Sequence, residues 1–516
     1  MTSSFSAAWL GGEPRALRFL PDSFRRLEDR KKAVENAVGR SVSPALAAAL
    51  VQQNAAYVNS AARDENLRRL GLPGTAVVVT GQQVGLFLGP LFTIYKAATA
   101  IAAARQLSSE TGRPVVPVFW IQNEDHDLPE VDHCFLPGPL KVQLPFSEPE
   151  KSRVPLAHVV MDPAPALQTL REQLGALPHA DELLGLLERA YRPGRTMPDA
   201  FADVVAELFA DDGLVLINPR GIAEHAAPVH RVALERAQAI CDGLTRRGAA
   251  LTRFGFGEQV HVRPGAPLSF FSPDAIDGPR FRIDPLHLEN AQWALSGHEA
   301  TLTTEQLLTA EPARFTTSAL LRPILQDTLL PTAAYVGGPG ELAYFSQLSG
   351  VYELLNLPMP MLVLRSRFRI LEDRTRTLLK EANLTADALE KPIAHPTAIS
   401  LEARLIKALE TELASERAEL LKIDPSLKKN LEQTSATIRF AIGKLASKVG
   451  RTLTAKDQTA LDRLAALRAQ LLPNGEPQER VYGLPYYAAK YGPRAFIALV
   501  MKTVVPFEGQ QADLTP

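Results

Sequence analysis

The sequence predicts an α/β protein with a Rossmann-like parallel sheet core, two inserted connecting segments and a long C-terminal α-helical coiled coil. Short apolar runs at 76–80, 213–217 and 361–364 alternate with helical patterns, which is typical of βαβ units and a parallel sheet. Longer stretches of different character interrupt this alternation twice. Beyond the last run, apolar residues recur at heptad spacing, which indicates a coiled coil.

Composition is that of a large cytoplasmic protein. The chain has 516 residues and is 46% hydrophobic, so it can bury a large core and should hold about two to four domains. Its 56 basic and 57 acidic residues indicate no bias toward nucleic acid or an anionic membrane. The only cysteines are Cys134 and Cys241, which predicts a reducing compartment. No signal peptide or membrane-spanning run is apparent, so we expect a cytoplasmic protein that binds neither membrane nor nucleic acid.

The changes of pattern divide the chain into segments of alternating core and insert. In order, we expect a helical lead-in (1–74), the first half of the Rossmann-like core (75–134), a first insert (135–211), a core segment (212–250), a second insert (251–317), the second half of the core (318–368), a helical coiled coil (369–473) and a C-terminal helix packing on the core (474–516).

The first strand is expected at Ala76–Thr80, where a continuous β-branched run suits a strand buried on both faces. The run stops at Gly81. Gly81, Gly85 and Gly89 lie four residues apart, and glycines at this spacing allow the backbone to turn tightly and approach a ligand. An ordinary glycine-rich connection is the alternative.

A helix should follow, beginning near Leu91 after a proline and ending at Gly112. The next strand is Val115–Ile121. Pro117 lies inside it and predicts either an edge position or a later start, because proline cannot donate to a sheet ladder.

Polar residues follow both strands directly. Right-handed βαβ connections place the ends of parallel strands at one edge of the sheet, where α/β proteins bind ligands. Candidate binding residues at this edge are Gly81, Gln82, Gln83, Gly85, Gly89, Thr93, Asn123 and Asp125. Glu124, His126 and Asp127 could act as general acids or bases. The alternative for this polar run is a solvated acidic loop.

Later core segments add candidates to the same edge. Asn218 follows the strand 213–217, and a second strand, glycine loop and helix occur at 333–341. These segments contribute the candidate binding residues Asn218, Arg322, Gln326, Asp327, Gly337, Gly338, Gly340 and Glu341. Arg322 could grip a carboxylate or form a surface ion pair, and Glu341 could instead complement the helix dipole. Residues 258–282 alternate as in a small antiparallel unit.

The coiled-coil seam is expected on 431–449. Leu431, Ile438 and Leu445 occupy d positions, with Ser435, Ile442 and Val449 at a. Residues 401–421 hold five acidic and three basic side chains, whereas 426–456 hold seven basic and one acidic. An antiparallel hairpin or an antiparallel dimer would pair these charges. Nucleic-acid binding by the basic half is disfavoured because aromatic residues are not interleaved with it.

Five stretches resemble the cysteine-adding enzymes (cysteine ligases) of bacillithiol biosynthesis. They are GQQVGLFLGPLFTIYKA, VPVFWIQNEDHDLPEVDH, LRPILQDTLLPTAAYVGGPGELAYFSQL, LLPNGEPQERV and YYAAKYGPRAF. The resemblance implies a homodimer formed through the C-terminal helices. It also implies addition of cysteine to glucosaminyl-malate, the last step of that pathway.

Amide formation requires an activated carboxylate, and ATP with Mg is the expected cosubstrate, through an adenylate-type intermediate. This expectation rests on chemistry and the resemblance, because the HIGH and KMSKS signatures of class I synthetases are absent. In this scheme Gly81, Gln82 and Gln83 hold the activated carboxyl or phosphate. His126, tuned by a neighbouring carboxylate, deprotonates the incoming ammonium.

The residues that follow the second strand could also support two other chemistries. A zinc or magnesium site could use Asp125, His126, Asp127, Asp132, His133 and Cys134, but the spacing matches no standard zinc pattern, so no tightly bound metal is expected. A Cys134 nucleophile is disfavoured because His133 would point away from it in an extended segment. The alternative function is a non-catalytic scaffold or sensor that binds a nucleotide or thiol and dimerises through its coiled coil.

Overall fold

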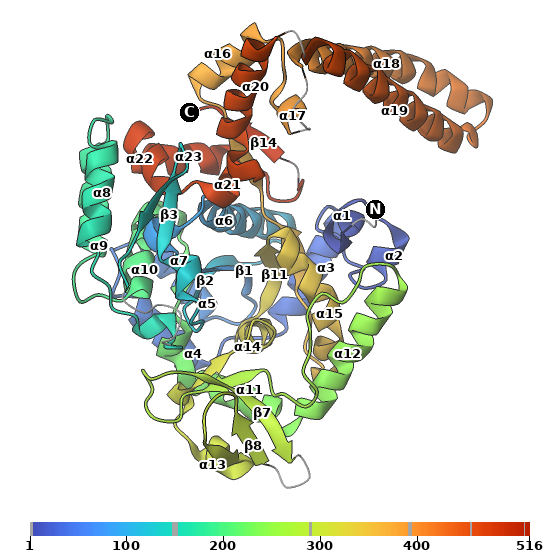
Figure 1. Ribbon diagram of the computed structural model, residues 1–516. Helices are drawn as coiled ribbons and strands as arrows, with labels where there is room; N and C mark the ends of the chain where they lie inside the picture. Colours follow the sequence, from blue (N-terminus) through green and yellow to red (C-terminus); the bar gives the residue numbers. More distant parts are fainter. Residues whose placement is uncertain (1–3, 147–152, 288–291, 391–394, 455–456, 510) are drawn as a thin grey trace. The chain divides into compact units, whose positions relative to one another are not determined.

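The computed structural model describes residues 4–146, 153–287, 292–390, 395–454, 457–509 and 511–516. The chain forms two compact units (Figure 1). The first contains residues 1–136, 140–368 and 482–512, and the second contains residues 137–139, 369–481 and 513–516. Within the described part of the chain, no helix has the length and apolarity needed to cross a membrane.

A five-stranded parallel sheet forms the centre of the first unit. Its strands are β1 (Ala76–Gln83), β2 (Val115–Gln122), β5 (Val215–Ile217), β11 (Thr332–Gly337) and β12 (Met361–Leu364), in the order β12-β11-β1-β2-β5. Nearly every residue of these strands is buried, as expected for a parallel sheet covered on both faces. The predicted Rossmann-like core is confirmed.

Strand β1 is longer than predicted. Gly81, Gln82 and Gln83 do not leave the sheet but pair with Trp120, Ile121 and Gln122 of β2. A Cβ atom at Gly81 would lie 2.8 Å from the Trp120 carbonyl oxygen, so glycine permits close strand packing there and makes no turn. The prediction that the strand stops at Gly81 was wrong.

The turn comes later, between Val84 and Pro90. Phe87, Leu88 and Gly89 have φ angles of 50°, 74° and 61°, in the left-handed region that bulky side chains rarely adopt. Both apolar side chains are buried. Burial of Phe87 and Leu88 therefore stabilises a strained backbone next to the carboxyl ends of the strands.

Strand β2 is an interior strand that begins at Val115, so both expectations from Pro117, an edge position or a later start, were wrong. Its neighbour β5 pairs only with Val118–Trp120, so Pro117 lies outside that ladder. On the other side Pro117 aligns with Val78 of β1. Because β5 is short, it needs no hydrogen bond from the backbone nitrogen at position 117.

Helices α6 (Phe92–Thr111) and α15 (Pro339–Leu355) cover opposite faces of the sheet. Right-handed crossovers place them there, because the steps from β1 to β2 and from β11 to β12 run in opposite directions along the sheet. Gly112, at φ 68°, ends α6 as predicted. Helices α22 (Leu484–Tyr491) and α23 (Pro493–Thr503) replace the single predicted final helix, because the chain breaks at Gly492. α23 packs on α6.

The lead-in is helical, as predicted, and is divided into five helices within residues 4–74. They are α1 (Phe5–Leu10), α2 (Pro14–Leu17), α3 (Leu27–Val38), α4 (Pro44–Asn54) and α5 (Ala61–Leu70). α3 packs on β11 and α4 on β5.

The first insert contains a hairpin and three longer helices. These are β3 (His133–Leu136), β4 (Leu140–Gln143), α8 (Ala164–Leu174), α9 (Ala180–Ala190) and α10 (Met197–Leu208), with the one-turn α7 (Leu128–Val131) before them. After β5, two helices follow, α11 (Ala223–Glu235) and α12 (Ala237–Arg253), with Arg236 between them.

The second insert contains an antiparallel sheet, which confirms the predicted character and extends it beyond 258–282. Its strands, in the order β10-β6-β7-β8-β9, are β6 (Ser269–Phe271), β7 (Phe281–His287), β8 (Gln292–Leu295), β9 (Thr301–Thr303) and β10 (Phe315–Thr317). The short helix α13 (Thr304–Thr309) lies between β9 and β10 in the chain. α14 (Leu321–Leu329) then leads into β11.

The second unit is helical. It contains α16 (Asp373–Glu381), α17 (Ala386–Leu389), α18 (Pro396–Ile423), α19 (Leu427–Thr454), α20 (Gln458–Leu471) and α21 (Gln478–Val481). The chain enters this unit within β13 (Arg367–Ile370) and returns to it within β14 (Gln511–Leu514). α18 and α19 pack as a hairpin, one of the two predicted arrangements.

Candidate functional site

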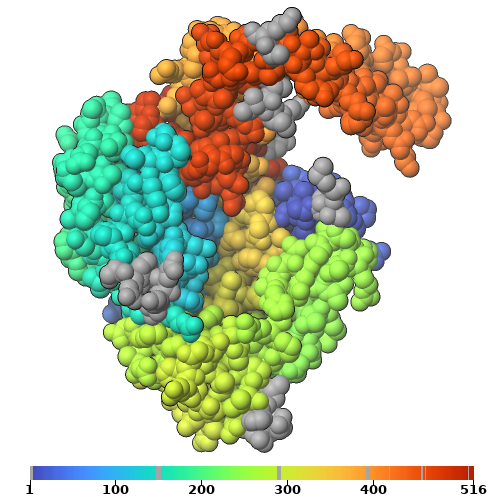
Figure 2. All heavy atoms as spheres, viewed as in Figure 1, coloured from blue at the N-terminus to red at the C-terminus, as the bar shows by residue number. Residues whose placement is uncertain are grey.

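The carboxyl edge of the parallel sheet gathers most of the predicted residues. Gln82 and Gln83 end β1, Asn123 and Glu124 follow β2, and Asn218 follows β5. Gly337 ends β11, and Gly338 caps the start of α15. Figure 2 shows a hollow on the face of the first unit, bordered by the first insert in cyan and the second insert in yellow-green. Two groups of polar side chains are built at this edge.

The first group, here named the Lys96 cluster, comprises Lys96, Arg322, Tyr335, Glu341 and Arg365. Lys96 projects from α6, is 3% exposed, and pairs with Glu341 Oε2 at 2.5 Å. Its Nζ also donates to the Gly81 carbonyl and to Gln82 Oε1, each at 3.0 Å. All three ammonium hydrogens are therefore used within the protein.

Glu341 is held from several directions at the start of α15. The Gly338 N–H donates to its Oε2 at 2.8 Å, and the Tyr335 hydroxyl donates to its Oε1 at 2.5 Å. Arg322 in turn donates to the Tyr335 oxygen at 3.0 Å. Glu341 is therefore part of a buried network and does more than complement the helix dipole.

The Lys96 cluster carries an excess of positive charge. Burial lowers the pKa of Lys96, and Arg365 and Arg322 lower it further, while Glu341 opposes these effects. Burial alone would raise the pKa of Glu341, but Lys96 and the Gly338 N–H outweigh burial and lower it. Three cations thus share one carboxylate, and a second negative group would be favoured there.

Gln326 and Asp327 lie on α14, and their side chains bond partners away from this edge. Arg322 donates to Gln326 Oε1 at 2.9 Å, and the Gln326 amide donates to Asp327 Oδ1 at 2.8 Å. The Tyr352 hydroxyl bonds the other Asp327 oxygen. Asp327 is fully buried, and burial raises the pKa of its carboxyl. This pair supports Arg322 and does not face the site.

The second group, here named the Arg280 cluster, comprises Asp125, His126 and Arg280. Arg280 stands directly before β7 in the second insert and is 4% exposed. Its Nε donates to His126 Nδ1 at 2.9 Å, and its terminal nitrogen donates to Asp125 Oδ1 at 2.7 Å. Phe270 lies under the guanidinium, 4.2 Å from its carbon to the ring centre.

The other residues of this loop have different partners from those predicted. Glu124 accepts hydrogen bonds from the backbone N–H and the hydroxyl of Thr317, so it is tied to the second insert and not to His126. Asn123 donates to Asn218 Oδ1 at 2.8 Å, which joins β2 to β5. Asp127 is exposed. Gln83 donates to Asp125 Oδ2 at 3.3 Å.

The remaining predicted residues have packing roles or open surroundings. A Cβ at Gly85 would lie 2.9 Å from the Gly89 Cα, so these glycines allow the strained loop to fold on itself. Gly340 has open space around it, and Gly337 lies close to Glu341. Thr93 is buried, and its hydroxyl has no hydrogen-bond partner among the described residues.

The candidate metal ligands fall into separate groups. Asp132 bonds His133 Nδ1 at 2.8 Å and Gln143 at 2.7 Å, whereas Asp125 and His126 bond Arg280. Within the described ranges, no three His, Cys, Asp or Glu side chains are grouped as metal ligands. Burial raises the pKa of Cys134 to about 12, so its thiol stays protonated at neutral pH and is unsuited to nucleophilic attack.

Sequence reasoning missed Lys96, Tyr335 and Arg280. A single lysine within the apolar stretch 91–104 is a signal that could have identified Lys96, since an unpaired buried cation is costly. Arg280 lies in an unremarkable loop, and only the folded chain brings it to Asp125 and His126.

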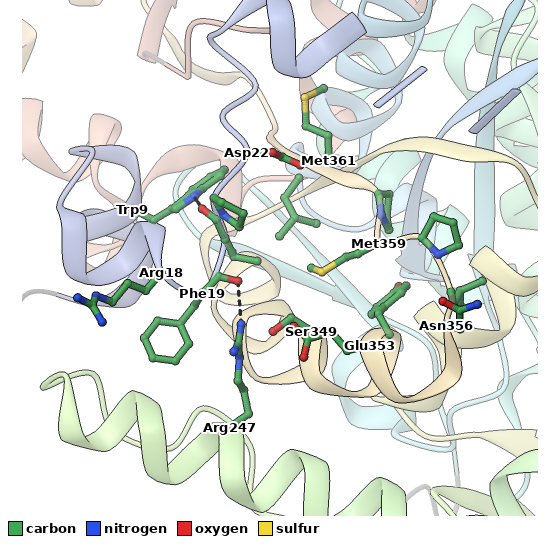
Figure 3. Close-up of a pocket in the computed structure, with 17 residues that line it drawn as sticks. Trp9, Arg18, Phe19, Asp22, Arg247, Ser349, Glu353, Asn356, Met359 and Met361 are labelled. Atoms are coloured by element: carbon green, nitrogen blue, oxygen red, sulfur yellow. Dashed lines mark hydrogen bonds between the residues drawn. The ribbon is translucent and has the colours of Figure 1, made fainter. Parts of the chain in front are cut away.

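A separate pocket of about 470 Å³ lies at the amino end of β12, against the lead-in helices (Figure 3). Trp9, Phe19 and Met359 contribute apolar surface, and Arg247 donates to the Phe19 carbonyl at 3.2 Å. None of the predicted site residues is among the described residues that line it.

The fold defines the class of this protein as a Rossmann-like α/β protein with an appended coiled coil. The family description "Bacillithiol biosynthesis BshC, N-terminal Rossmann-like domain" matches residues 1–366, and "Bacillithiol biosynthesis BshC, C-terminal coiled-coil domain" matches residues 373–512. The chain belongs to the BshC family.

Relatives with the name "Putative cysteine ligase BshC" cover most of the chain. The protein of Koribacter versatilis is 37% identical, over 83% of this chain and 81% of its own length. That of Salinibacter ruber is 33% identical, over 92% and 89%. That of Bacillus licheniformis is 31% identical, over 84% of each.

Proposed function

We propose that this protein is a cytoplasmic cysteine ligase that joins the carboxyl group of cysteine to the amine of glucosaminyl-malate, the last step of bacillithiol synthesis. Membership of the BshC family carries the proposal. The positive excess of the Lys96 cluster supports it, because both proposed substrates carry carboxylates.

The chain's own residues suit binding and orientation of anionic groups. Lys96 is a cation, so the Gln82 atom that accepts from it is the amide oxygen, and the Gln82 NH₂ group is left to donate to a ligand. Arg322 and Arg365 add positive charge nearby. These groups would hold a carboxylate or phosphate at the ends of β1 and β11.

ATP with magnesium is the proposed cosubstrate. The cysteine carboxylate would attack the α-phosphorus of ATP to form an adenylate and release pyrophosphate. The amine would then attack the adenylate carbonyl, AMP would leave, and the amine proton would pass to solvent. The donor set of Gln82, Arg322 and Arg365 fits phosphate groups, since all three present N–H groups or positive charge.

We further propose that the protein is a homodimer formed through α18 and α19. The hairpin leaves Ile438 and Leu445 exposed, at 37% and 51%. A second copy would cover this apolar surface.

The test is product formation by purified protein supplied with cysteine, glucosaminyl-malate, ATP and Mg²⁺, followed by mass spectrometry of derivatised thiols. Bacillithiol should appear, and Gln82→Ala should lower its rate by about two orders of magnitude with an unchanged melting temperature. Gln106→Ala is the matched control, because Gln106 bonds Glu110 near the other end of α6. Deletion of the gene should abolish bacillithiol while glucosaminyl-malate accumulates. Binding of a thiol or nucleotide without turnover would support the scaffold alternative.

A further inference from the structure

His126 is held in one protonation form by a neighbour from the second insert. A guanidinium has only N–H donors, so the ring nitrogen facing Arg280 Nε at 2.9 Å must be an acceptor. His126 Nδ1 therefore carries the lone pair. In the neutral ring the hydrogen then resides on Nε2, which makes this nitrogen a donor.

The surroundings of Arg280 fix this geometry. The same guanidinium bonds Asp125 at 2.7 Å, the Thr316 hydroxyl at 3.2 Å and the Thr317 carbonyl at 3.4 Å. It is almost fully buried and lies on Phe270. The guanidinium of Arg280 donates to several acceptors at once. It therefore cannot rotate away from His126 without breaking these other hydrogen bonds.

The charges around His126 keep the ring neutral near pH 7. Burial lowers the pKa of His126, and Arg280 and Arg153 lower it further. Asp125, whose Oδ1 lies 3.7 Å from His126 Nδ1, and Asp127 act in the opposite direction. The net effect of burial and these charges is a lowered pKa of His126.

We propose that His126 donates a hydrogen bond from Nε2 to an anionic oxygen of the substrates, and that Arg280 is the positioning residue that selects this tautomer. The proposal rests on the ligase function proposed above and assigns His126 a different role from the predicted base. A base needs a ring lone pair facing the substrate, and here Arg280 occupies that lone pair.

Two variants of His126 can distinguish a donor role from a base role. The Gln side chain can place an N–H donor near the position of Nε2 but cannot act as a base. His126→Ala should lower the rate of bacillithiol formation by about 10² to 10³, the effect of removing one oxyanion donor. His126→Gln should retain at least about a tenth of the wild-type rate.

A loss in kcat would identify the anionic oxygen as one that develops during the reaction. A loss confined to KM would identify a carboxylate or phosphate of the bound ground state. A His126→Gln variant as inactive as His126→Ala, with both melting at the wild-type temperature, would overturn the donor role.

A second measurement does not depend on activity. In protein labelled with ¹⁵N-histidine, long-range proton–nitrogen spectra report which ring nitrogen carries hydrogen, and His126→Gln identifies the His126 signals. The wild-type ring should be the Nε2–H tautomer. Arg280→Lys should raise the pKa of His126 and mix the tautomers, because a lysine cannot bond Asp125 and His126 in the same planar arrangement.

Arg282→Lys is the matched control, since Arg282 lies two residues further along the chain and bonds Asp284. It should leave the His126 spectrum unchanged. A wild-type Nδ1–H tautomer, or an Arg280→Lys spectrum identical to wild type, would overturn the assignment. If Arg280→Lys fails to fold, the wild-type tautomer decides alone. Absence of bacillithiol from the wild-type assay would refute the ligase function while leaving the tautomer result to judge the role of Arg280.

Discussion

Lys96 shows how one buried charge can join segments that lie far apart in the sequence. Its ammonium group links the Gly81 carbonyl of β1, the Gln82 side chain and Glu341 of α15. No hydrogen remains for a ligand in this arrangement. The role that follows is orientation of Gln82 and of the helix start that carries Glu341.

Replacement of Lys96 by methionine should therefore reduce stability strongly. Methionine fills a similar volume but leaves Glu341, whose side chain is 19% exposed, without its cation, and loss of one partner of a buried pair typically costs about 3–5 kcal/mol. Denaturant unfolding should show a drop of this order in the free energy of unfolding. Lys32→Met is the control, because the exposed Lys32–Asp22 pair should contribute at most about 1 kcal/mol. Equal losses in both variants would show that Lys96 has no special structural role.

At the scale of elements, the sequence predicted the strands and helices that have strong local patterns. It did not predict features that depend on a neighbouring strand. β2, α6 and its Gly112 end were predicted well, because apolar runs and glycine stops are local signals. The continuation of β1 through Gly81 depends on β2, and the interior position of Pro117 depends on the short β5. Those partners cannot be read from the residues themselves.

The candidate site follows the same division. The sheet topology brought Gln82, Asn123 and Asn218 to one edge, as βαβ geometry predicted. The tautomer of His126 could not be predicted, because it depends on Arg280 in the second insert. For that reason we propose a donor role for His126 in place of the predicted base role, which stays a prediction until it is tested.

Helix α11 and the second insert are joined through a histidine that responds to pH. His230 of α11 bonds the Ser269 hydroxyl at 2.9 Å and stacks on Phe315 with ring centres 5.0 Å apart. Burial lowers its pKa to about 3, and Arg220 contributes in the same direction. The folded protein thus requires a neutral His230 at this junction.

This junction should weaken as the pH falls below about 6.5, the usual histidine pKa. In that range the unfolded chain binds a proton that the folded chain refuses, so the free energy of unfolding decreases by up to about 1.4 kcal/mol per pH unit from this group. The contribution is complete above pH 6.5. His230→Gln should remove this part of the slope in denaturant titrations between pH 8 and pH 5.

The exposed His261 provides the control, and His261→Gln should keep the wild-type slope. If His230→Gln and wild type lose stability in parallel across this range, protonation of His230 is not opposed by the fold.

At the scale of the molecule, the second unit combines a confirmed pairing with a seam that differs in part from the predicted one. α18 and α19 form the hairpin, and opposite charges meet across it in Arg439–Glu410 at 3.0 Å and Arg417–Glu432 at 3.8 Å. Ala446 is buried, whereas Ile438 and Leu445, predicted at d positions, are exposed. The predicted d position Leu431 and the predicted a positions Ser435, Ile442 and Val449 are half-buried, so only the d positions Ile438 and Leu445 lie open.

That open face is the basis for the dimer prediction. Ile438 and Leu445 lie one heptad apart on α19, so they share a face that the hairpin does not cover, and a second copy related by a two-fold axis would bury it. Ile438→Glu combined with Leu445→Glu should convert a dimer of the wild-type chain to a monomer in light scattering. Because both side chains are exposed, the helix content should be unchanged in circular dichroism. Thr437→Glu combined with Ser447→Glu adds the same charge at exposed polar positions of α19 and should leave the dimer intact. A wild-type chain at the monomer mass, at micromolar concentration, would show that the hairpin needs no partner and that these two apolar side chains remain in water.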